Sequence, residues 1–425
     1  MSCRLQLLIV LGGLFAAGPL SPSAALAGDT LAPDWEAERV RKRPVDTDSA
    51  QFVPGKGLEF KSADGDFLLQ TRLRAQFLYS GTVVPDEDYS HDFMIRRARL
   101  QFAGNMWGKN NKFKVEFAVS PRDESNEAVD FDGDDIDDAN VVKTTPLLDW
   151  YNEFTYLRDL TLRIGQYKVP YSRQRVISSG DLQMVDRSST ANGEFTLDRD
   201  LGLDIRSKDL FGLDLFKYYA GVYIGEGRNT SNKSVGAGDA GLMYIGRVEV
   251  LPFGTFQDYS EADLERSTEP GLSLGVAYAY IADAPGESGI MGSAITDDVW
   301  NYTNMTGDIL LKYVGFSLLS EVFMRSGDSE SGVSTSNGWG GMAQAGYLLP
   351  RTALEITGRY GMNRRIGTAA ESSFDEGNNE AGGGLGYYFA HHPLKVQSDV
   401  FQGWTEEDGP EKGETTVRMQ LQAAF

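Results

Sequence analysis

The stretch Thr416-Val417-Arg418-Met419-Gln420-Leu421-Gln422-Ala423-Ala424-Phe425 alternates apolar and polar side chains. One face of the extended chain carries Val417, Met419, Leu421, Ala423 and Phe425, and the other carries Thr416, Arg418, Gln420 and Gln422. Alternation with a period of two indicates a β-strand with one apolar and one polar face. The stretch therefore predicts a strand whose two faces meet different surroundings.

The same alternation recurs through the chain from Phe67 onward, between clusters of Gly, Asn, Asp and Pro. We predict about sixteen strands, an even number that is typical of bacterial membrane barrels. The closing strand, with its aromatic end, resembles the last strand of outer-membrane β-barrels, so its apolar face is expected to meet lipid. The predicted strands are 67–80, 92–107, 111–120, 148–157, 160–168, 199–207, 212–225, 239–251, 270–282, 298–314, 315–326, 338–349, 352–363, 378–390, 393–405 and 414–425.

The connections between these strands alternate in length. Most joints on one side are tight, and 252–269 is the exception. Joints on the other side are longer, namely 81–91, 121–147, 169–198, 226–238, 283–297, 327–337, 364–377 and 406–413. Short periplasmic turns opposite long external loops are the topology of outer-membrane barrels. The fold class expected is therefore an all-β, transmembrane antiparallel β-barrel over 56–425.

Two segments precede the predicted barrel. Residues 1–27 are typical of a secretory signal peptide, with Arg4, an apolar run and the small-residue site Ala25-Leu26-Ala27. An uncleaved membrane anchor is the alternative, although the apolar run is short. Residues 28–55 are polar and charged, which favours a periplasmic extension rather than a strand. Either a short helix or a disordered segment fits that composition.

Composition excludes several functions. The net charge of -21 argues against nucleic acid as a partner. The one cysteine, Cys3, lies in the predicted signal, so disulfides, thiol catalysis and cysteine metal sites are not expected. The acidic run at 130–138 resembles a calcium loop only weakly, and a solvated external loop is the favoured interpretation. No cofactor, metal site or catalytic residue is expected.

Basic side chains gather on the polar faces of the predicted strands. A cation facing lipid costs about 2–4 kcal/mol, so these side chains should face the lumen. The candidate pore-lining and anion-binding residues are Arg72, Arg74, Arg97, Arg99, Lys114, Arg163, Arg247, Arg359, Lys395 and Arg418. Arg96 falls on the same strand face as its apolar neighbours, so we predict that it lies near the external interface or at a subunit contact. The alternative is that these basic side chains pair with carboxylates of the barrel wall as a neutral network and form no path for anions.

The 169–198 connection is the best candidate for a constriction, because long loops in compact folds are often functional. It carries five charged residues that could narrow the lumen, namely Arg173, Arg175, Asp181, Asp186 and Arg187. We predict that this loop folds inward. If it stayed outside the barrel, the same residues would form only a solvated loop.

Several stretches in consistent order resemble the porin O/P family of phosphate- and polyphosphate-selective porins. They are residues 93–100 around Arg96-Arg97, 162–172, 186–188, 354–360 and 386–396, and the terminal Phe425. The resemblance implies a trimeric, sixteen-stranded outer-membrane channel that guides small anions past inward arginines and lysines. It also implies contact with lipid and lipopolysaccharide, and recognition of Phe425 by the barrel-assembly machinery.

Three other functions remain open from the sequence. A general or sugar-type porin would carry aromatic stacking residues such as Tyr167, Tyr171 or Phe195 at its constriction. A structural barrel with a blocked lumen would not conduct. An outer-membrane enzyme would need a nucleophile beside a base, and the three histidines lie at a loop end (His91) and in a short turn (His391 and His392), which we expect to be solvated.

Overall fold

The computed structural model describes residues 50–53, 55–120, 146–229, 241–284, 289–290, 300–330, 335–367, 374, 377–406 and 409–425. Its sheet comprises two short strands, β1 (Gln51–Val53) and β2 (Gly57–Lys61), and sixteen longer ones. The longer strands are β3 (Leu68–Val83), β4 (Ser90–Asn105), β5 (Asn111–Ala118), β6 (Leu147–Leu157), β7 (Leu160–Lys168), β8 (Arg199–Ser207), β9 (Phe216–Tyr223), β10 (Met243–Val250), β11 (Gly271–Ala284), β12 (Trp300–Tyr313), β13 (Phe316–Ser329), β14 (Gly338–Leu348), β15 (Leu354–Arg365), β16 (Asn378–Ala390), β17 (Leu394–Thr405) and β18 (Glu414–Ala424).

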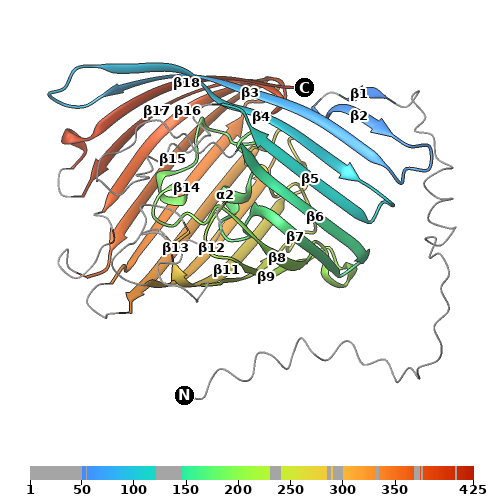
Figure 1. Cartoon of the computed structure of the whole chain (residues 1–425). Helices are drawn as coiled ribbons and strands as arrows, with labels where there is room; N and C mark the ends of the chain where they lie inside the picture. The colour runs from blue at the N-terminus through green and yellow to red at the C-terminus, as the bar shows by residue number, and fades with distance from the viewer. Residues whose placement is uncertain are drawn as a thin grey trace, which may run out of the picture. The chain divides into compact units, whose positions relative to one another are not determined.

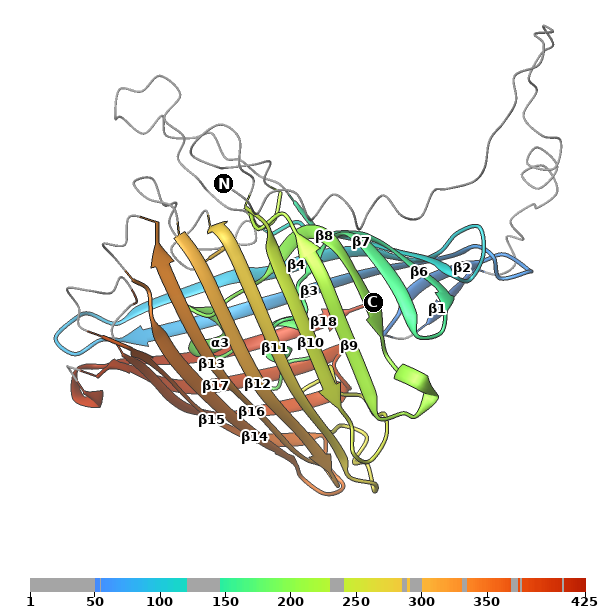
Figure 2. The same ribbon diagram turned by 90° about the horizontal axis from the view of Figure 1, so that it is seen from below.

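Each strand from β3 to β18 pairs antiparallel with the next, and β18 pairs with β3 to close the barrel. In the closing pair, Met419 lies opposite Tyr79 and Leu421 opposite Phe77. Phe425 extends this ladder through two main-chain hydrogen bonds with Leu73, of 2.7 and 2.9 Å. The prediction of a closed sixteen-stranded barrel is therefore confirmed, and Figures 1 and 2 show the inclined strands around a common lumen. Closure leaves no strand edge unpaired, as a sheet in lipid requires.

The side chains of the strands alternate between the outer surface and the lumen. On β13, Val322 is 57% exposed on the outside, whereas Glu321 beside it is fully buried on the inside. The same alternation puts Val417 and Met419 outside on β18. Across the described residues, no helix is long and apolar enough to span a membrane. The alternating strands give the barrel an apolar outer band.

The observed strands differ from the predicted ones mainly at their ends. β9 begins at Phe216 rather than 212, because residues 210–212 form a 3-10 turn. β3 and β4 extend further than expected, which shortens the loop between them to residues 84–89. The extension also contains a strand after all, since β1 pairs with β2 and β2 pairs with β3. The predicted signal peptide and the acidic run at 130–138 lie outside the described residues.

Two connections between strands enter the lumen. One is the 169–198 loop between β7 and β8, which carries the short helices α2 (Arg173–Val176) and α3 (Ser189–Asn192). The other is the 252–269 segment between β10 and β11, whose Asp258, Glu261 and Asp263 are buried. Figure 1 shows α2 enclosed by the strands. These two segments decide how much of the lumen stays open.

Candidate functional site: a basic lumen narrowed by an inward loop

Two serines shape the 169–198 loop locally. The Ser172 hydroxyl accepts a hydrogen bond of 3.1 Å from the Arg175 main-chain N–H, and so caps α2. The Ser188 hydroxyl caps α3 in the same way through the Ala191 N–H. Such caps satisfy main-chain donors that a short helix leaves free. They let the loop hold a defined shape inside the barrel.

Arg173 fixes the start of this loop to the wall formed by β10–β12. Its guanidinium lies 2.5 Å from the Asp308 carboxylate and 3.5 Å from that of Glu249, and the side chain is fully buried. Glu321 on β13 adds two contacts, because it accepts from the Ser172 hydroxyl and from the Gln174 N–H. Arg173, predicted at the constriction, is therefore an anchor in the wall and does not face open space.

The 252–269 segment supports the loop from the side of the short turns. Glu261 accepts from the Gln174 side chain at 2.9 Å and from the Gln183 N–H at 2.7 Å. It also accepts from Gln344 on β14. One buried carboxylate thus joins both inward segments to the wall.

An apolar cluster fills one side of the lumen, between the loop and β9–β13. From the loop it includes Tyr171 and Phe195, and from the wall Ile281 and Phe323, all of them buried. Tyr167 belongs to the same cluster. Tyr171 and Phe195, considered for sugar stacking, are covered by neighbouring side chains, whereas Tyr167 also lines a cavity on the β3–β8 side. The part of the lumen that this cluster leaves open consequently lies on the side of the other strands.

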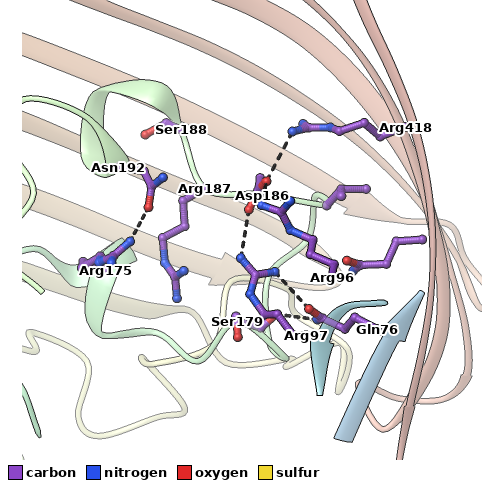
Figure 3. A network of polar contacts seen from close by, with 12 residues as sticks. Gln76, Arg96, Arg97, Arg175, Ser179, Asp186, Arg187, Ser188, Asn192 and Arg418 are labelled. Atoms are coloured by element: carbon purple, nitrogen blue, oxygen red, sulfur yellow. Dashed lines mark hydrogen bonds and ion pairs between the residues drawn. The ribbon is translucent and has the colours of Figure 1, made fainter. Parts of the chain in front are cut away.

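Asp186 in the loop meets arginines from β4 and β18. Arg96 and Arg97 bind its carboxylate from β4, the latter at 3.2 Å, and Arg418 lies 3.5 Å away on β18 (Figure 3). Burial alone would raise the pKa of the Asp186 carboxyl, but the arginines outweigh burial and hold that pKa below its usual range. Asp186 therefore connects the loop to β4 and β18 through ion pairs.

The position of Arg96 corrects its prediction. Gln76 pairs with Arg97 and Phe77 pairs with Ile95, so a β-bulge leaves Arg96 without an opposite residue. A bulge inserts one extra residue and locally breaks the strict alternation. Both Arg96 and Arg97 consequently turn inward to Asp186, and Arg96 is not at an external interface.

A cavity of about 180 Å³ lies between the loop and the strands β3–β8. Six basic side chains line it, against the two carboxylates of Glu116 and Asp149. Val176, Ser178 and Ser179 of the loop also line it. The basic residues are Arg74, Arg99, Lys114, Arg163, Lys168 and Arg199, four of which are among the predicted pore-lining set.

The basic residues of this cavity fall into two groups. Four have carboxylate partners: Arg99 with Glu116 at 3.1 Å, Lys114 and Arg199 with Asp149 at 2.6 Å, and Arg163 with Glu153 at 2.5 Å. Arg74 instead donates to the hydroxyls of Ser178 and Ser179, at 2.9 and 3.1 Å. Lys168 donates to main-chain carbonyls, including that of Arg175 at 2.7 Å. In these contacts, both residues are held by neutral partners.

Three predicted pore-lining residues are buried beneath the inward segments. Arg247 contacts Glu249 at 2.7 Å and Asp308 at 2.6 Å. Lys395 donates to the Leu182 carbonyl at 2.6 Å and is fully buried. Arg359 binds Glu380 and the Asp186 carbonyl. They do face inward, but the loop and the 252–269 segment cover them.

The remaining predicted residues take other positions. Arg72 lies half-buried on the inner face of β3. Arg175 pairs with Asp198 at 2.8 Å, and Arg187 donates to the Gln174 and Ile177 carbonyls. Asp181 is half-buried in the loop. Arg175 and Arg187 thus bind within their own loop.

His392 also departs from its prediction, because it is buried rather than solvated. Its Nε2 lies 3.1 Å from the Ser260 hydroxyl, and the inward 252–269 segment supplies that serine. The other ring nitrogen faces the Lys395 ammonium at 3.5 Å. Burial and Lys395 lower the pKa of His392 well below its usual value. A lysine in the place of the orienting carboxylate does not make a catalytic triad.

Sequence reasoning missed Arg199 and Asp149 in the basic cavity. Alternation assigns Arg199 to the same face as Leu201 and Leu203, which point outward. It lies at the first residue of β8, where the chain leaves the loop, and its side chain reaches Asp149. The buried acids of 252–269 were missed as well. The one sign of these acids in the sequence was that the 252–269 connection is unusually long for the side of the barrel that otherwise has short turns.

Several solved structures share this fold. The anion-selective porin from Comamonas acidovorans has 12% identity, with 84% of this chain and 100% of that one covered at a TM-score of 0.54. The outer membrane channel DcaP of Acinetobacter baumannii has 13% identity, with 86% and 99% covered and a TM-score of 0.53. A trimer form of the Vibrio cholerae outer membrane protein OmpT has 12% identity, with 84% and 99% covered and a TM-score of 0.50. A sequence comparison with curated proteins finds no significant match.

The sequence also matches a family model over the whole barrel. That model is described as phosphate-selective porin O and P, and it matches residues 68–425, from the first residue of β3 to the end of the chain. The match confirms the resemblance found in the motifs around Arg96-Arg97 and Asp186. The chain therefore belongs to the phosphate-selective porin O and P family, and its place is the bacterial outer membrane.

Proposed function

We propose that this porin is a passive diffusion channel that prefers small, phosphate-like anions. The basic cavity between the 169–198 loop and β3–β8 carries this proposal. Its six basic side chains outnumber its two carboxylates. A ring of arginine and lysine side chains in a narrow pore favours anions.

Arg74 contributes most of this preference. For Arg74, the partners are the hydroxyls of Ser178 and Ser179, so no carboxylate in hydrogen-bond contact offsets its charge. The paired cations contribute less, since a neighbouring carboxylate offsets each of them. The wall is therefore neutral where basic side chains pair with carboxylates, and it is basic where a basic side chain has neutral partners.

The 169–198 loop is the proposed constriction. Its residues Val176, Ser178 and Ser179 line the cavity, and Asp186 further along the loop binds β4 and β18. Anions would pass between this loop and the inner face of β3–β8. We also propose a homotrimer, as in the trimer form of OmpT, and contact with lipid and lipopolysaccharide at the apolar outer band.

A planar bilayer with a potassium chloride gradient tests the preference. The reversal potential should have the sign of chloride, and Arg74→Gln should lower the chloride-to-potassium permeability ratio. One unit charge about 4 Å from the ion path is worth about 1 kcal/mol in water, or roughly fivefold. The control is Arg158→Gln, since Arg158 lies exposed in the β6–β7 turn.

Two outcomes contradict the proposal. A potassium-signed reversal potential that Arg74→Gln leaves unchanged rejects the anion preference, and the absence of current steps rejects an open channel. Phosphate added to the chloride solution should reduce the chloride current through competition at the cavity. If phosphate has no such effect, the general porin without phosphate selectivity is the better description.

A further inference from the structure

His392 lies in the turn between β16 and β17, and its side chain is buried. Its Nε2 lies 3.1 Å from the Ser260 hydroxyl of the inward 252–269 segment. The Tyr388 ring packs against the imidazole nearly at right angles, with 5.6 Å between the ring centroids. The neighbouring His391 differs, because it is exposed beside Glu265. One imidazole of the pair is therefore part of the attachment of an inward segment.

Lys395 connects this imidazole to the 169–198 loop. Its ammonium group lies 3.5 Å from Nδ1 of His392 and donates to the Leu182 carbonyl at 2.6 Å. Gln422 joins the same parts of the chain, since its amide donates to the Gly180 carbonyl at 3.0 Å and to the main-chain carbonyl of His392. The turn that holds His392 is thus linked to both of the segments that enter the lumen.

This hydrogen-bond pattern requires a neutral imidazole. Because an ammonium group can only donate, Nδ1 of His392 accepts from Lys395, and Nε2 carries the proton that it donates to the Ser260 hydroxyl. A second proton would place an N–H on Nδ1, which would then face the ammonium group and lose its hydrogen bond. The two cations would also repel each other at a buried position, where water screens little.

The charged groups that act most strongly on His392 disfavour a second proton as well. Burial and four basic groups lower the pKa of its imidazole well below the usual value. The basic groups, from the largest effect to the smallest, are Lys395, Lys312, His391 and Arg72. Carboxylates on neighbouring elements have other partners, since Glu355 on β15 accepts from the Tyr388 hydroxyl and Glu261 accepts from the loop and from β14.

We propose that acidification, through proton uptake by His392, releases the two inward segments from the β16–β17 turn and loosens the constriction loop. Release gives the imidazole access to water, where its pKa returns to about 6.5. The released state therefore binds one more proton below that pH, and each pH unit of acidification favours it by up to about tenfold. This inference rests on the proposed role of the 169–198 loop as the constriction.

Urea unfolding of the purified porin in lipid vesicles tests the proton uptake. The range from about pH 7.5 to about pH 5 lies above the ordinary pKa of carboxyl groups, about 4. His392→Gln keeps one donor and one acceptor but cannot titrate. On acidification below about pH 6.5, the wild-type unfolding constant should therefore rise relative to that of His392→Gln, by up to about tenfold per pH unit. His391→Gln is the matched control, and it should respond to pH as the wild type does.

Single-channel recordings over the same pH range test the loosening of the loop. Open-channel current noise should increase on acidification in the wild type and in His391→Gln, and it should stay constant in His392→Gln. Because urea unfolding needs no ion flow, it decides the proton uptake separately from the channel activity. An absence of current would reject the proposed channel and would leave the unfolding result intact.

The inference is overturned if the wild type and His392→Gln share one pH dependence of unfolding, or one rise in noise. A response that disappears in His391→Gln also overturns it, because the exposed histidine would then be the group that titrates. Heat-modifiable migration on a gel identifies variants that have not folded. If His392→Gln is among them, Lys395→Gln decides, since it keeps a donor for the Leu182 carbonyl and removes the ammonium group. Its response to acid should be weaker than that of the wild type, and an equal response rejects the inference.

Discussion

At the scale of single residues, Asp186 brings three arginines together inside the barrel. Arg96, Arg97 and Arg418 all direct their guanidinium groups to this one carboxylate. Arg418 has a second partner in Asp399, at 2.7 Å, whereas the β4 pair depends more heavily on Asp186. Removal of the Asp186 charge should therefore expose positive charge from β4.

Asp186→Asn is accordingly expected to raise the chloride-to-potassium permeability ratio, by up to roughly fivefold for one unit charge. Reversal potentials in a salt gradient measure the change. Asp86→Asn, in the exposed connection between β3 and β4, removes a charge outside the lumen and should have little effect. An unchanged or lower ratio in Asp186→Asn would show that this carboxylate does not set the charge of the path.

Single residues also show where prediction from the sequence stops. Strict alternation correctly predicted that Arg97, Arg99 and Arg418 face inward, because a cation that faces lipid is costly. It failed for Arg96, since a β-bulge shifts parity by one position without any sign in composition. It could not distinguish Arg74, which lines the cavity, from Lys395, which the loop covers, because that difference depends on tertiary packing.

At the scale of elements, the two inward segments act as one unit. The 169–198 loop was predicted to fold inward from its length and charge, but the 252–269 segment was noticed only as an exception among short turns. Glu261 accepts hydrogen bonds from Gln174 and Gln183 of the loop, and Arg173 of the loop contacts Asp258 of the 252–269 segment at 3.3 Å. Contacts between segments this far apart in sequence leave no local pattern from which to predict them.

Glu261→Gln should loosen the constriction loop, because the new amide group would face donors that need an acceptor. Loss of hydrogen bonds to a buried charge costs about 1.5–3 kcal/mol each. We expect a lower thermal unfolding midpoint and greater open-channel current noise. Glu265→Gln is the matched control on the same segment, since Glu265 is exposed beside His391. Equal noise in both variants would contradict a bracing role for Glu261.

At the scale of the whole molecule, buried apolar clusters lie inside the barrel and an apolar band lies outside it. The inner core joins the loop to β9–β13 and leaves the path on the side of β3–β8. The outer band follows from alternation alone, which explains why the strand number was predicted correctly. The inner core was not predicted, since Tyr171 and Phe195 lie on a loop without strand periodicity.

The closing strand offers a direct test of this division between outside and inside. Met419 lies on the outer face of β18 and Thr416 on the inner face, where it lines a polar cavity. Met419→Lys should destabilise the folded barrel in lipid vesicles by up to about 2–4 kcal/mol, the cost of a cation near the bilayer midplane. Thr416→Lys, with its ammonium in water, should cost much less, as measured by denaturant unfolding of both variants. Similar losses would mean that the two faces do not meet lipid and water as described. A larger loss of unfolding free energy for Met419→Lys requires that alternate residues of β18 face lipid and water. A closed barrel that contains water provides that arrangement.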